Sequence, residues 1–267
     1  MTVLQALVLG LLQGLAEFLP ISSSAHLALT PWAFGWPAPG LAFDVALHVG
    51  TLVAVLAYFR REWVRLLLAA RDIAVTRRVA TEDQRRVVYL VIGTIPGAIG
   101  GLLLNEYAET VFRAPALIAT TLIVMGLVLW IVDRVSPHAR PLSAMRWQDA
   151  LFIGVAQVLA LVPGVSRSGA TMTAGRVVQL DRASAATFSF LLSMPITAAA
   201  AVFKVPEALG EPGLAAPLLV GVVASGISGW LAIAVLLRYL ARRSFGVFAV
   251  YRVILGVAVL LTLYARG

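Results

Sequence analysis

Residues 13–26 read QGLAEFLPISSSAH, a polar stretch inside an apolar region that extends from residue 3 to residue 34. Pro20 breaks this region midway, and a proline and a serine cluster break a second region, 148–179, in the same way. Each arm of the second region has only about 12 to 14 residues, near 20 Å at 1.5 Å per residue, which is too short to cross a bilayer. Both regions are therefore predicted to form re-entrant helical hairpins, whose irregular tips need protein or water around them.

The composition is that of a membrane protein. Hydrophobic residues make up 60% of the chain and charged residues 13%, and the mean hydropathy is +0.92. A soluble domain carries roughly 25% charged residues. Residues 1–19 lack a basic leader and an Ala-x-Ala exit, so we expect the first helix to be retained. The absence of cysteine excludes disulfides, thiolate metal sites and cysteine nucleophiles.

Six further apolar runs, each of about 18 to 24 residues, are long enough to cross roughly 30 Å of hydrocarbon. They cover residues 42–59, 87–104, 115–132, 183–203, 214–237 and 245–265. With the two hairpins, these runs predict an all-α, polytopic protein that forms a single integral membrane domain over residues 1–267.

The basic residues predict the orientation. Sixteen of the 21 lie in the loops 60–86, 134–147, 176–182 and 238–243, and three lie in the loops and terminus on the other side. Short loops rich in arginine mark the cytoplasmic face, so the net charge of +8 gives no reason to expect a nucleic-acid partner. In this topology the first hairpin opens outward and the second inward, and the tips can meet near the midplane of the membrane.

The two halves resemble each other at a shift of 144 residues. The shift aligns Gln13 with Gln157, and it aligns Ser22 and Ser24 with Ser166 and Ser168. We therefore expect two repeats, about 1–135 and 146–267, each with one hairpin and three crossings. An odd number of crossings inverts the second copy, and inverted repeats place binding sites between broken helices at the midplane. Chance similarity between apolar helices is the alternative.

The first hairpin gathers groups that can carry chemistry. Gln13 and Glu17 lie four residues apart, on one helical face. The serines 22–24 open the next helix, where free N–H groups favour an anion, and His26 follows Ser23 by one turn. A lone glutamate in an apolar helix costs about 3 kcal/mol on insertion scales, so Glu17 needs a role or a partner. The structural alternatives are an arginine partner for Glu17, simple N-capping by the serines, and a satisfied core histidine.

The second hairpin has the composition of a phosphate cradle. Its tip, 163–171, reads PGVSRSGAT, in which three hydroxyl side chains flank Arg167 and two glycines allow close backbone approach. The stretch lacks the Gly-Lys-Ser/Thr of a Walker loop, but the planar guanidinium suits two phosphate oxygens. A structural bridge from Arg167 to Glu17 would also hold the two tips together.

Three residues in the crossings are weaker candidates. Asp44 and His48 share a helical face near the outer boundary, with a supporting or a structural role. Arg252 lies within the last crossing, and we expect its side chain to snorkel towards the cytoplasmic surface.

At these residues the chain resembles the undecaprenyl-diphosphatase family, also called the bacitracin-resistance family. The resemblance covers essentially the whole chain and rests on Gln13-x-x-x-Glu17, on PISSSAH at 20–26 and on PGVSRSGAT at 163–171. It implies removal of the terminal phosphate from undecaprenyl diphosphate, in the bacterial inner membrane, at a site reached from the periplasmic side. The reaction recycles the lipid carrier of peptidoglycan synthesis and confers bacitracin resistance.

The resemblance also implies roles for individual residues. Ser23 is the expected nucleophile, Glu17 and His26 are its acid–base support, and Arg167 neutralises the phosphate. The expected substrate contacts are Gln13, Ser22, Ser24, Ser166, Ser168, Gly169 and Thr171.

Cofactors and partners follow from the same resemblance. Many members carry glutamate where this chain has Gln13, so a metal site with two carboxylates is not expected here. We expect no tightly bound cofactor, and Mg²⁺ or Ca²⁺ only as an ion shared by the substrate phosphates and Glu17. The expected partners are a polyprenyl diphosphate and membrane lipids, and a homodimer is compatible with the sequence. A transporter or lipid flippase is the main rival, because broken helices in inverted repeats are also a transporter architecture. A purely structural or receptor protein would leave the buried charges unexplained.

Overall fold

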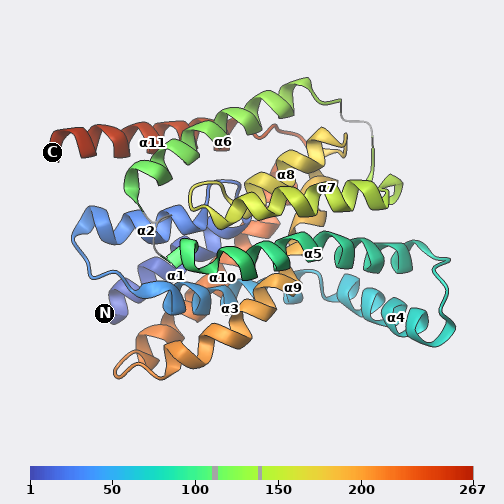
Figure 1. Cartoon of the computed structure of the whole chain (residues 1–267), viewed down its shortest axis with the longest axis horizontal. Coiled ribbons are helices and arrows are strands. Elements are labelled where there is room, and N and C mark those ends of the chain that lie inside the picture. The colour runs from blue at the N-terminus through green and yellow to red at the C-terminus, as the bar shows by residue number, and fades with distance from the viewer. Residues whose placement is uncertain (110–113, 138–139, 267) are drawn as a thin grey trace.

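The computed structural model describes residues 1–109, 114–137 and 140–266, and the side chains of 104–109 fall outside the description (Figure 1). The helices of the first half are α1 Val3–Phe18, α2 Ser23–Phe34, α3 Gly40–Tyr58, α4 Arg60–Thr76, α5 Glu82–Glu109 and α6 Pro115–Val135. Those of the second half are η2 Leu142–Ala144, α7 Trp147–Val158, η3 Leu159–Leu161, α8 Arg167–Val177, α9 Arg182–Leu209, α10 Ala215–Leu240 and α11 Gly246–Arg266. The chain is all-α, as predicted.

Six of these helices are long and apolar enough to cross a membrane, which confirms the predicted polytopic architecture. They are α3, α5 over Glu82–Leu103, α6, α9, α10 and α11. Each overlaps one of the six apolar runs found in the sequence. The protein is therefore a multi-pass membrane protein.

The two interrupted regions fold as pairs of short helices, as the sequence indicated. In the first, α1 ends at Phe18 and α2 begins at Ser23; in the second, α7 and η3 precede α8. The helices α1, α2, α7 and α8 have 16, 12, 12 and 11 residues. At 1.5 Å per residue all four are shorter than the roughly 30 Å that a membrane crossing requires.

The segment after α3 differs from the prediction, because residues 60–76 were expected to form a loop and instead form α4. Charge hid an amphipathic pattern here: Leu66 and Ala69 are 3% and 6% exposed and face the protein. On the same face, one turn before Leu66, Glu62 accepts a hydrogen bond from Arg86 at 2.5 Å, which ties α4 to α5. This arginine-rich segment is therefore an ordered helix.

The two short first arms pack in matching ways. In the fold α1 lies along α10, and α7 lies along α5 (Figure 1). Both contacts depend on glycine: a Cβ on Gly10 would overlap the backbone of Gly221, and a Cβ on Gly154 would overlap that of Gly93. Close approach of backbones at small residues is the usual way in which helices pack within a membrane.

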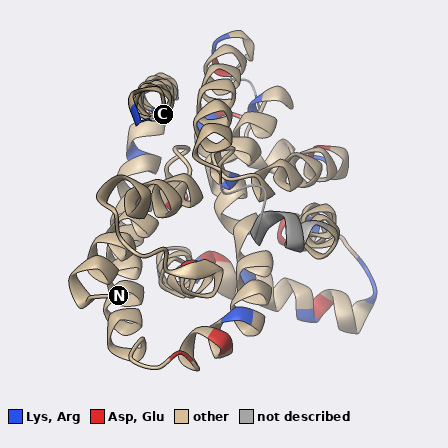
Figure 2. Cartoon of the chain, turned by 60° about the vertical axis from the view of Figure 1, so that its left-hand side comes forward, with Lys and Arg blue, Asp and Glu red and all other residues tan. Residues whose placement is uncertain are grey.

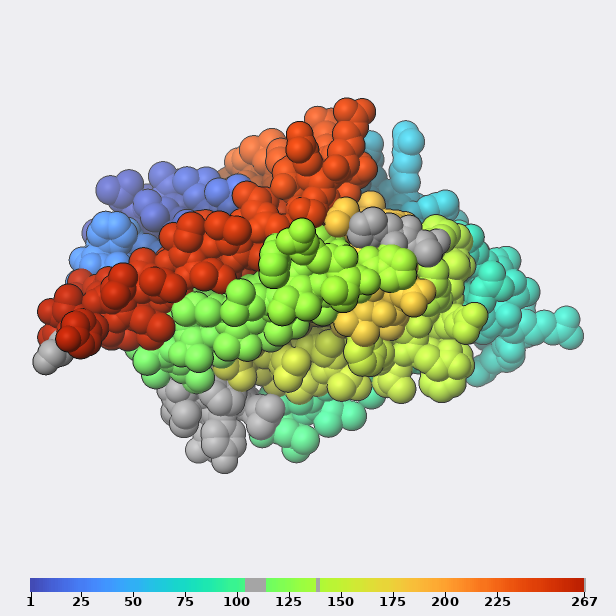
Figure 3. Space-filling model, turned by 90° about the horizontal axis from the view of Figure 1, so that it is seen from above, coloured from blue at the N-terminus to red at the C-terminus, as the bar shows by residue number. Residues whose placement is uncertain are grey.

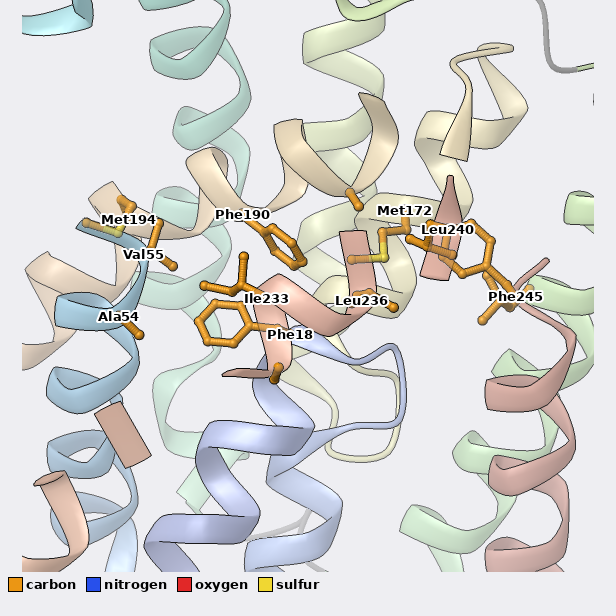
Figure 4. Close-up of a cluster of buried hydrophobic side chains, with 13 residues drawn as sticks. Phe18, Ala54, Val55, Met172, Phe190, Met194, Ile233, Leu236, Leu240 and Phe245 are labelled. Atoms are coloured by element: carbon orange, nitrogen blue, oxygen red, sulfur yellow. The ribbon is translucent and has the colours of Figure 1, made fainter. Parts of the chain in front are cut away.

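A hydrophobic cluster packs around the end of α1 (Figure 4). Phe18, at the end of α1, meets Phe190 of α9 edge to face, with ring centroids 5.2 Å apart. Ile233 and Leu236 of α10 are fully buried beside them. This packing fixes the end of α1, and therefore the position of Glu17 one residue earlier.

On another face, α6 and α11 run side by side, green and red in Figure 3. Charged positions are sparse among the helices (Figure 2).

Where α6 ends, the buried Asp133 binds Arg176 at 3.1 Å and Arg182 at 2.8 Å. Arg176 was assigned to a cytoplasmic loop, but it lies in α8 with its side chain fully buried. Its charge holds α6 and α8 together rather than facing water.

Candidate active site

The tips of the two hairpins have the same local structure. Ser22 caps the N-terminus of α2, where its hydroxyl accepts from Ala25 N at 3.3 Å, and Ser166 caps α8, accepting from Gly169 N at 3.0 Å. Both serines have a positive φ, 75° and 71°, in a region that residues with a Cβ rarely adopt. Strained backbone of this kind persists where the surrounding structure holds it in place, and it gathers at functional sites.

The tips touch each other directly. Gly164 N of the second tip donates to Ser22 Oγ at 3.1 Å, and Ser168 Oγ donates to the carbonyl oxygen of Leu19 at 3.1 Å. The sequence predicted that the tips would meet, and this expectation is confirmed.

Arg252 pins the two tips from the last helix. Its guanidinium donates to the carbonyl oxygens of Pro20 at 3.2 Å, Gly164 at 2.8 Å and Val165 at 2.9 Å. The prediction that Arg252 snorkels towards the surface is therefore wrong, since the residue is fully buried. The physical reason is that the irregular tips leave carbonyl groups without helical partners, and one guanidinium can bind several of them.

Glu17 is the centre of the site. Its Oε2 accepts a hydrogen bond from Ser23 Oγ at 2.5 Å and another from Gln13 Nε2 at 3.1 Å. Its Oε1 accepts from Arg167, which forms an ion pair with it across the two tips. The structural bridge left open by the sequence is thus present, and it places carboxylate, hydroxyl and guanidinium together.

Arg167 is held in place from its other side by α9. Its Nη1 donates to the carbonyl oxygen of Ser193 at 3.0 Å and to Thr197 Oγ1 at 2.8 Å. The guanidinium therefore has a fixed plane, which suits recognition of two phosphate oxygens.

A cavity of about 190 Å³ opens beside this cluster. Its polar lining comes from Glu17, Ser23, Ser24, His48, Gln157, Ser166, Arg167 and Thr197. Its apolar lining comes from Val45, Gly97, Ala160, Leu161, Ile196 and Ala200. A cavity with a polar end and an apolar wall fits a ligand that has an anionic head and a hydrocarbon tail.

His48 belongs to the site, although the sequence gave it only a supporting or structural role. Its Nε2 lies 3.4 Å from Glu17 Oε2. Its Nδ1 lies 2.8 Å from the carbonyl oxygen of Asp44, which can only accept, so Nδ1 carries a hydrogen. Its Nε2 therefore faces the carboxylate of Glu17. Its i, i+4 spacing from Asp44 was visible in the sequence, but its approach to α1 was not.

His26 has other partners than those the sequence indicated. Its Nδ1 lies 2.7 Å from the carbonyl oxygen of Ser22, and its Nε2 lies 2.6 Å from the hydroxyl of Tyr251. The two rings are also stacked, with centroids 5.7 Å apart. Its Nδ1 is engaged within the first tip and its Nε2 by α11, whereas the spacing of the sequence favoured contact with Ser23.

Several predicted substrate contacts support the tips instead of lining the cavity. Ser22 and Ser168 join the tips, and Gln13 binds Glu17. Gly169 leaves room for Arg252, whose Nη1 would lie 2.6 Å from a Cβ at that position. Thr171 bonds to the carbonyl oxygen of Arg167 at 2.7 Å and to Ser189 Oγ at 2.6 Å. Of the predicted substrate contacts, Ser24 and Ser166 line the cavity.

The donors do not fit a divalent cation held by protein alone. In the part of the chain that the structure describes, no group of three or more His, Cys, Asp or Glu side chains is placed to bind one. Both oxygens of Glu17 already accept from Ser23 and Arg167, so a metal ion on Glu17 would compete with a guanidinium. The expected metal contact at Glu17 therefore conflicts with its geometry.

Comparison with known proteins identifies the family of this chain. The family model described as Bacitracin resistance protein BacA matches residues 6–258. The chain belongs to this family.

Individual relatives match over their whole length. A protein of Gemmatimonas aurantiaca named undecaprenyl-diphosphatase is 64% identical over 266 residues, covering 100% of both chains. Proteins of the same name from Moorella thermoacetica and Pelotomaculum thermopropionicum are 51% and 50% identical over 267 residues, covering 100% of this chain and 100% and 98% of theirs.

Proposed function

We propose that this protein hydrolyses undecaprenyl diphosphate to undecaprenyl phosphate and inorganic phosphate. The observation that carries the proposal is the hydrogen bond from Ser23 Oγ to Glu17 Oε2 at 2.5 Å, with Arg167 paired to the same carboxylate. A carboxylate base beside a hydroxyl is the arrangement of an activated nucleophile. The names of the relatives supply the lipid. The reaction recycles the lipid carrier of peptidoglycan synthesis and confers bacitracin resistance.

The reaction proceeds by phosphoryl transfer. Glu17 takes the proton of Ser23, Ser23 Oγ attacks the terminal phosphorus, and the bond to the bridging oxygen breaks, so that prenyl monophosphate leaves with that oxygen. Water then attacks the phosphoserine and releases inorganic phosphate. Arg167 and the N-termini of α2 and α8 neutralise charge on the equatorial oxygens, which is where most of the catalysis in such reactions arises. Direct attack by water is the alternative route.

The two histidines take different roles in this scheme. His48 faces Glu17 and can accept or return the proton that Glu17 removes from Ser23. His26 holds the carbonyl group of Ser22 in the strained cap, so it positions the serine tip through the backbone. This division replaces the acid–base role that the sequence suggested for His26.

A metal ion, in this proposal, arrives with the substrate. The diphosphate can carry Mg²⁺ or Ca²⁺ on its own oxygens, and the side chains of the site supply no complete set of ligands. No cofactor is tightly bound.

For the membrane arrangement we propose two inverted repeats in the bacterial inner membrane, with the site reached from the periplasmic side. The matching packing of α1 on α10 and α7 on α5 supports the repeats. The excess of arginine in 60–86 and 238–243 supports a cytoplasmic position for those segments.

The orientation is tested by labelling. A cysteine in place of the exposed Glu211, between α9 and α10, should react with a membrane-impermeant thiol reagent in intact cells, because this loop is placed outside. A cysteine in place of Val75, 74% exposed at the end of α4, should react only after the cells are broken. The opposite pattern of labelling would invert the topology.

The transporter reading shares this architecture, and the two functions are compatible. The Ser23–Glu17 pair favours an enzyme, because moving an anion needs hydrogen-bond donors but no base beside a hydroxyl. The test is phosphate release from farnesyl diphosphate by the purified protein, with the substrate labelled at the terminal phosphate and the reaction quenched in acid. We expect the label on Ser23 during turnover. Turnover without labelled serine at any time would establish direct attack by water, and the absence of phosphate release would favour the transporter over the enzyme.

A further inference from the structure

Gln157 is a buried amide whose polar atoms have no hydrogen-bond partner. It is 4% exposed, it lies at the end of α7, and it lines the cavity beside Glu17. Neither its Nε2 nor its Oε1 has a partner among the described residues. A buried amide group without a hydrogen bond is unfavourable, so this side chain is prepared for a ligand that supplies one.

The neighbours of Gln157 hold its amide in position. A Cβ placed on Gly97 of α5 would lie 2.7 Å from Gln157 Nε2. The same Cβ would lie 2.5 Å from Cδ1 of Ile196 on α9. Only glycine at position 97 leaves space for the amide between α5 and α9. Ile196 on the far side of this space is apolar, and no described residue gives the amide a hydrogen-bond partner.

The counterpart of Gln157 in the first half shows what is missing. Gln13, 144 residues earlier, donates its Nε2 to Glu17 at 3.1 Å. The residue in the second half that corresponds to Glu17 is Leu161, which cannot accept a hydrogen bond. The second half thus retains the amide without the acid, and an incoming anion can take the place of the carboxylate.

The groups that line the cavity match the parts of a prenyl diphosphate. Glu17, Ser23 and Arg167 form the reactive end, and Ala160, Leu161 and Ala200 belong to the apolar wall near Gln157. In the substrate the inner phosphate lies between the terminal phosphate and the prenyl chain. Gln157 shares the cavity with Ser23 and precedes the apolar Ala160 and Leu161 by about one turn, so we place the inner phosphate at its amide when the terminal phosphate lies against Ser23.

We propose that Gln157 forms the subsite for the inner phosphate, with Nε2–H donating to one of its non-bridging oxygens. The inference rests on the proposed function and extends it, because it assigns a residue to the prenyl monophosphate that leaves. Gln157 is a substrate-binding residue in this scheme, and it makes no contact with the attacked phosphorus.

The test compares Gln157→Leu, Gln157→Asn and Gln157→Glu with wild type in one detergent, with farnesyl diphosphate as substrate. The leucine variant should raise KM about tenfold and change kcat less than threefold, because the lost bond is made in both ground and transition states. Inhibition by farnesyl monophosphate should weaken about tenfold, while inhibition by inorganic phosphate stays unchanged. The glutamate variant should weaken inhibition by farnesyl monophosphate further, because its negative charge repels the phosphate. The asparagine variant should give an inhibition constant between those of the leucine variant and wild type.

Gln13→Leu is the matched control, since it removes the equivalent amide from the reactive end. It should lower kcat and leave inhibition by farnesyl monophosphate unchanged. The proposal is overturned if Gln157→Leu binds farnesyl monophosphate as tightly as wild type, or if it weakens inorganic phosphate and the monophosphate alike. Thermal unfolding of each variant shows whether it is folded. If Gln157→Leu is misfolded, the inhibition of Gln157→Asn by farnesyl monophosphate tests the proposal instead.

Failure of the proposed function is a separate outcome. If wild type releases no phosphate from farnesyl diphosphate, the binding of farnesyl monophosphate can still be followed by its effect on thermal unfolding. Weaker binding by Gln157→Leu would then support the subsite without hydrolysis.

Discussion

The two hairpin tips share a backbone design and differ in chemistry. In each, a serine with positive φ caps a short helix, and the first residue of that helix is Ser23 in one tip and Arg167 in the other. Both of these side chains bind Glu17. Equivalent positions thus deliver a hydroxyl from one side and a cation from the other to a single carboxylate. The acid occurs once, since its counterpart is Leu161, and this limits repulsion of a diphosphate.

Removing the hydroxyl from the first tip tests the comparison most severely. Ser23→Ala should reduce phosphate release by about 10³-fold or more, because the nucleophile is lost while the capping serine remains. The measurement is initial rate with farnesyl diphosphate. Ser24→Ala is the control: Ser24 Oγ lies 3.2 Å from Ser22 Oγ instead of bonding to Glu17, so this variant should lose far less. Equal rates for Ser23→Ala and wild type would mean that water, and not Ser23, attacks the terminal phosphorus.

Changing the cation of the second tip tests geometry separately from charge. Arg167→Lys keeps the positive charge and loses the planar fork, so kcat should fall roughly a hundredfold, with a smaller change in KM. Phosphate release against substrate concentration, with Arg167→Ala alongside, separates the two parameters. A lysine variant with unchanged kcat and a raised KM would move Arg167 from the transition state to substrate capture.

The two histidines sharpen the comparison further, because one faces the carboxylate and the other faces the backbone. His48→Gln should lower kcat about tenfold or more and change the pH profile of kcat, because His48 Nε2 lies 3.4 Å from Glu17 Oε2. His26→Gln should lower the rate without changing the shape of the profile. If the pH profile of kcat changed for His26→Gln and not for His48→Gln, His26 and not His48 would transfer the proton.

The smallest expected effect is on stability, at the two capping serines. Ser166→Ala loses one capping bond and should destabilise the protein by about 1 kcal/mol. Ser22→Ala should lose more, since Ser22 Oγ also accepts from Gly164 N across the tips. Thermal unfolding in detergent measures both. Equal losses of stability in the two variants would mean that the hydrogen bond from Gly164 N to Ser22 Oγ adds nothing to stability.

Much of the fold was predictable because the bilayer constrains sequence strongly. The six long apolar runs became the six long helices, and Pro20 and Pro163 marked the two tips. Within the site, Glu17 and Arg167 stood out because a charge in an apolar run needs a partner. The segment 60–76 was missed because its arginines masked the apolar face that packs on α5.

The rest of the site depends on distant packing. His48 reaches Glu17 because α3 lies beside α1, and no local spacing encodes that approach. The partner of His26 is Tyr251, 225 residues away. Arg252 looked like a surface residue because its ligands are carbonyl groups, which every residue carries and no sequence pattern reveals.

The guanidinium of Arg252 makes the two tips mechanically one body. It bonds to Pro20 in the first hairpin and to Gly164 and Val165 in the second, so separating the hairpins would strand a buried cation and three carbonyl groups at once. We therefore expect motions that open the cavity to come from the surrounding helices rather than from separation of the tips. A lipid diphosphate would enter from the side, between helices, and the reacting groups would keep their mutual geometry throughout the cycle.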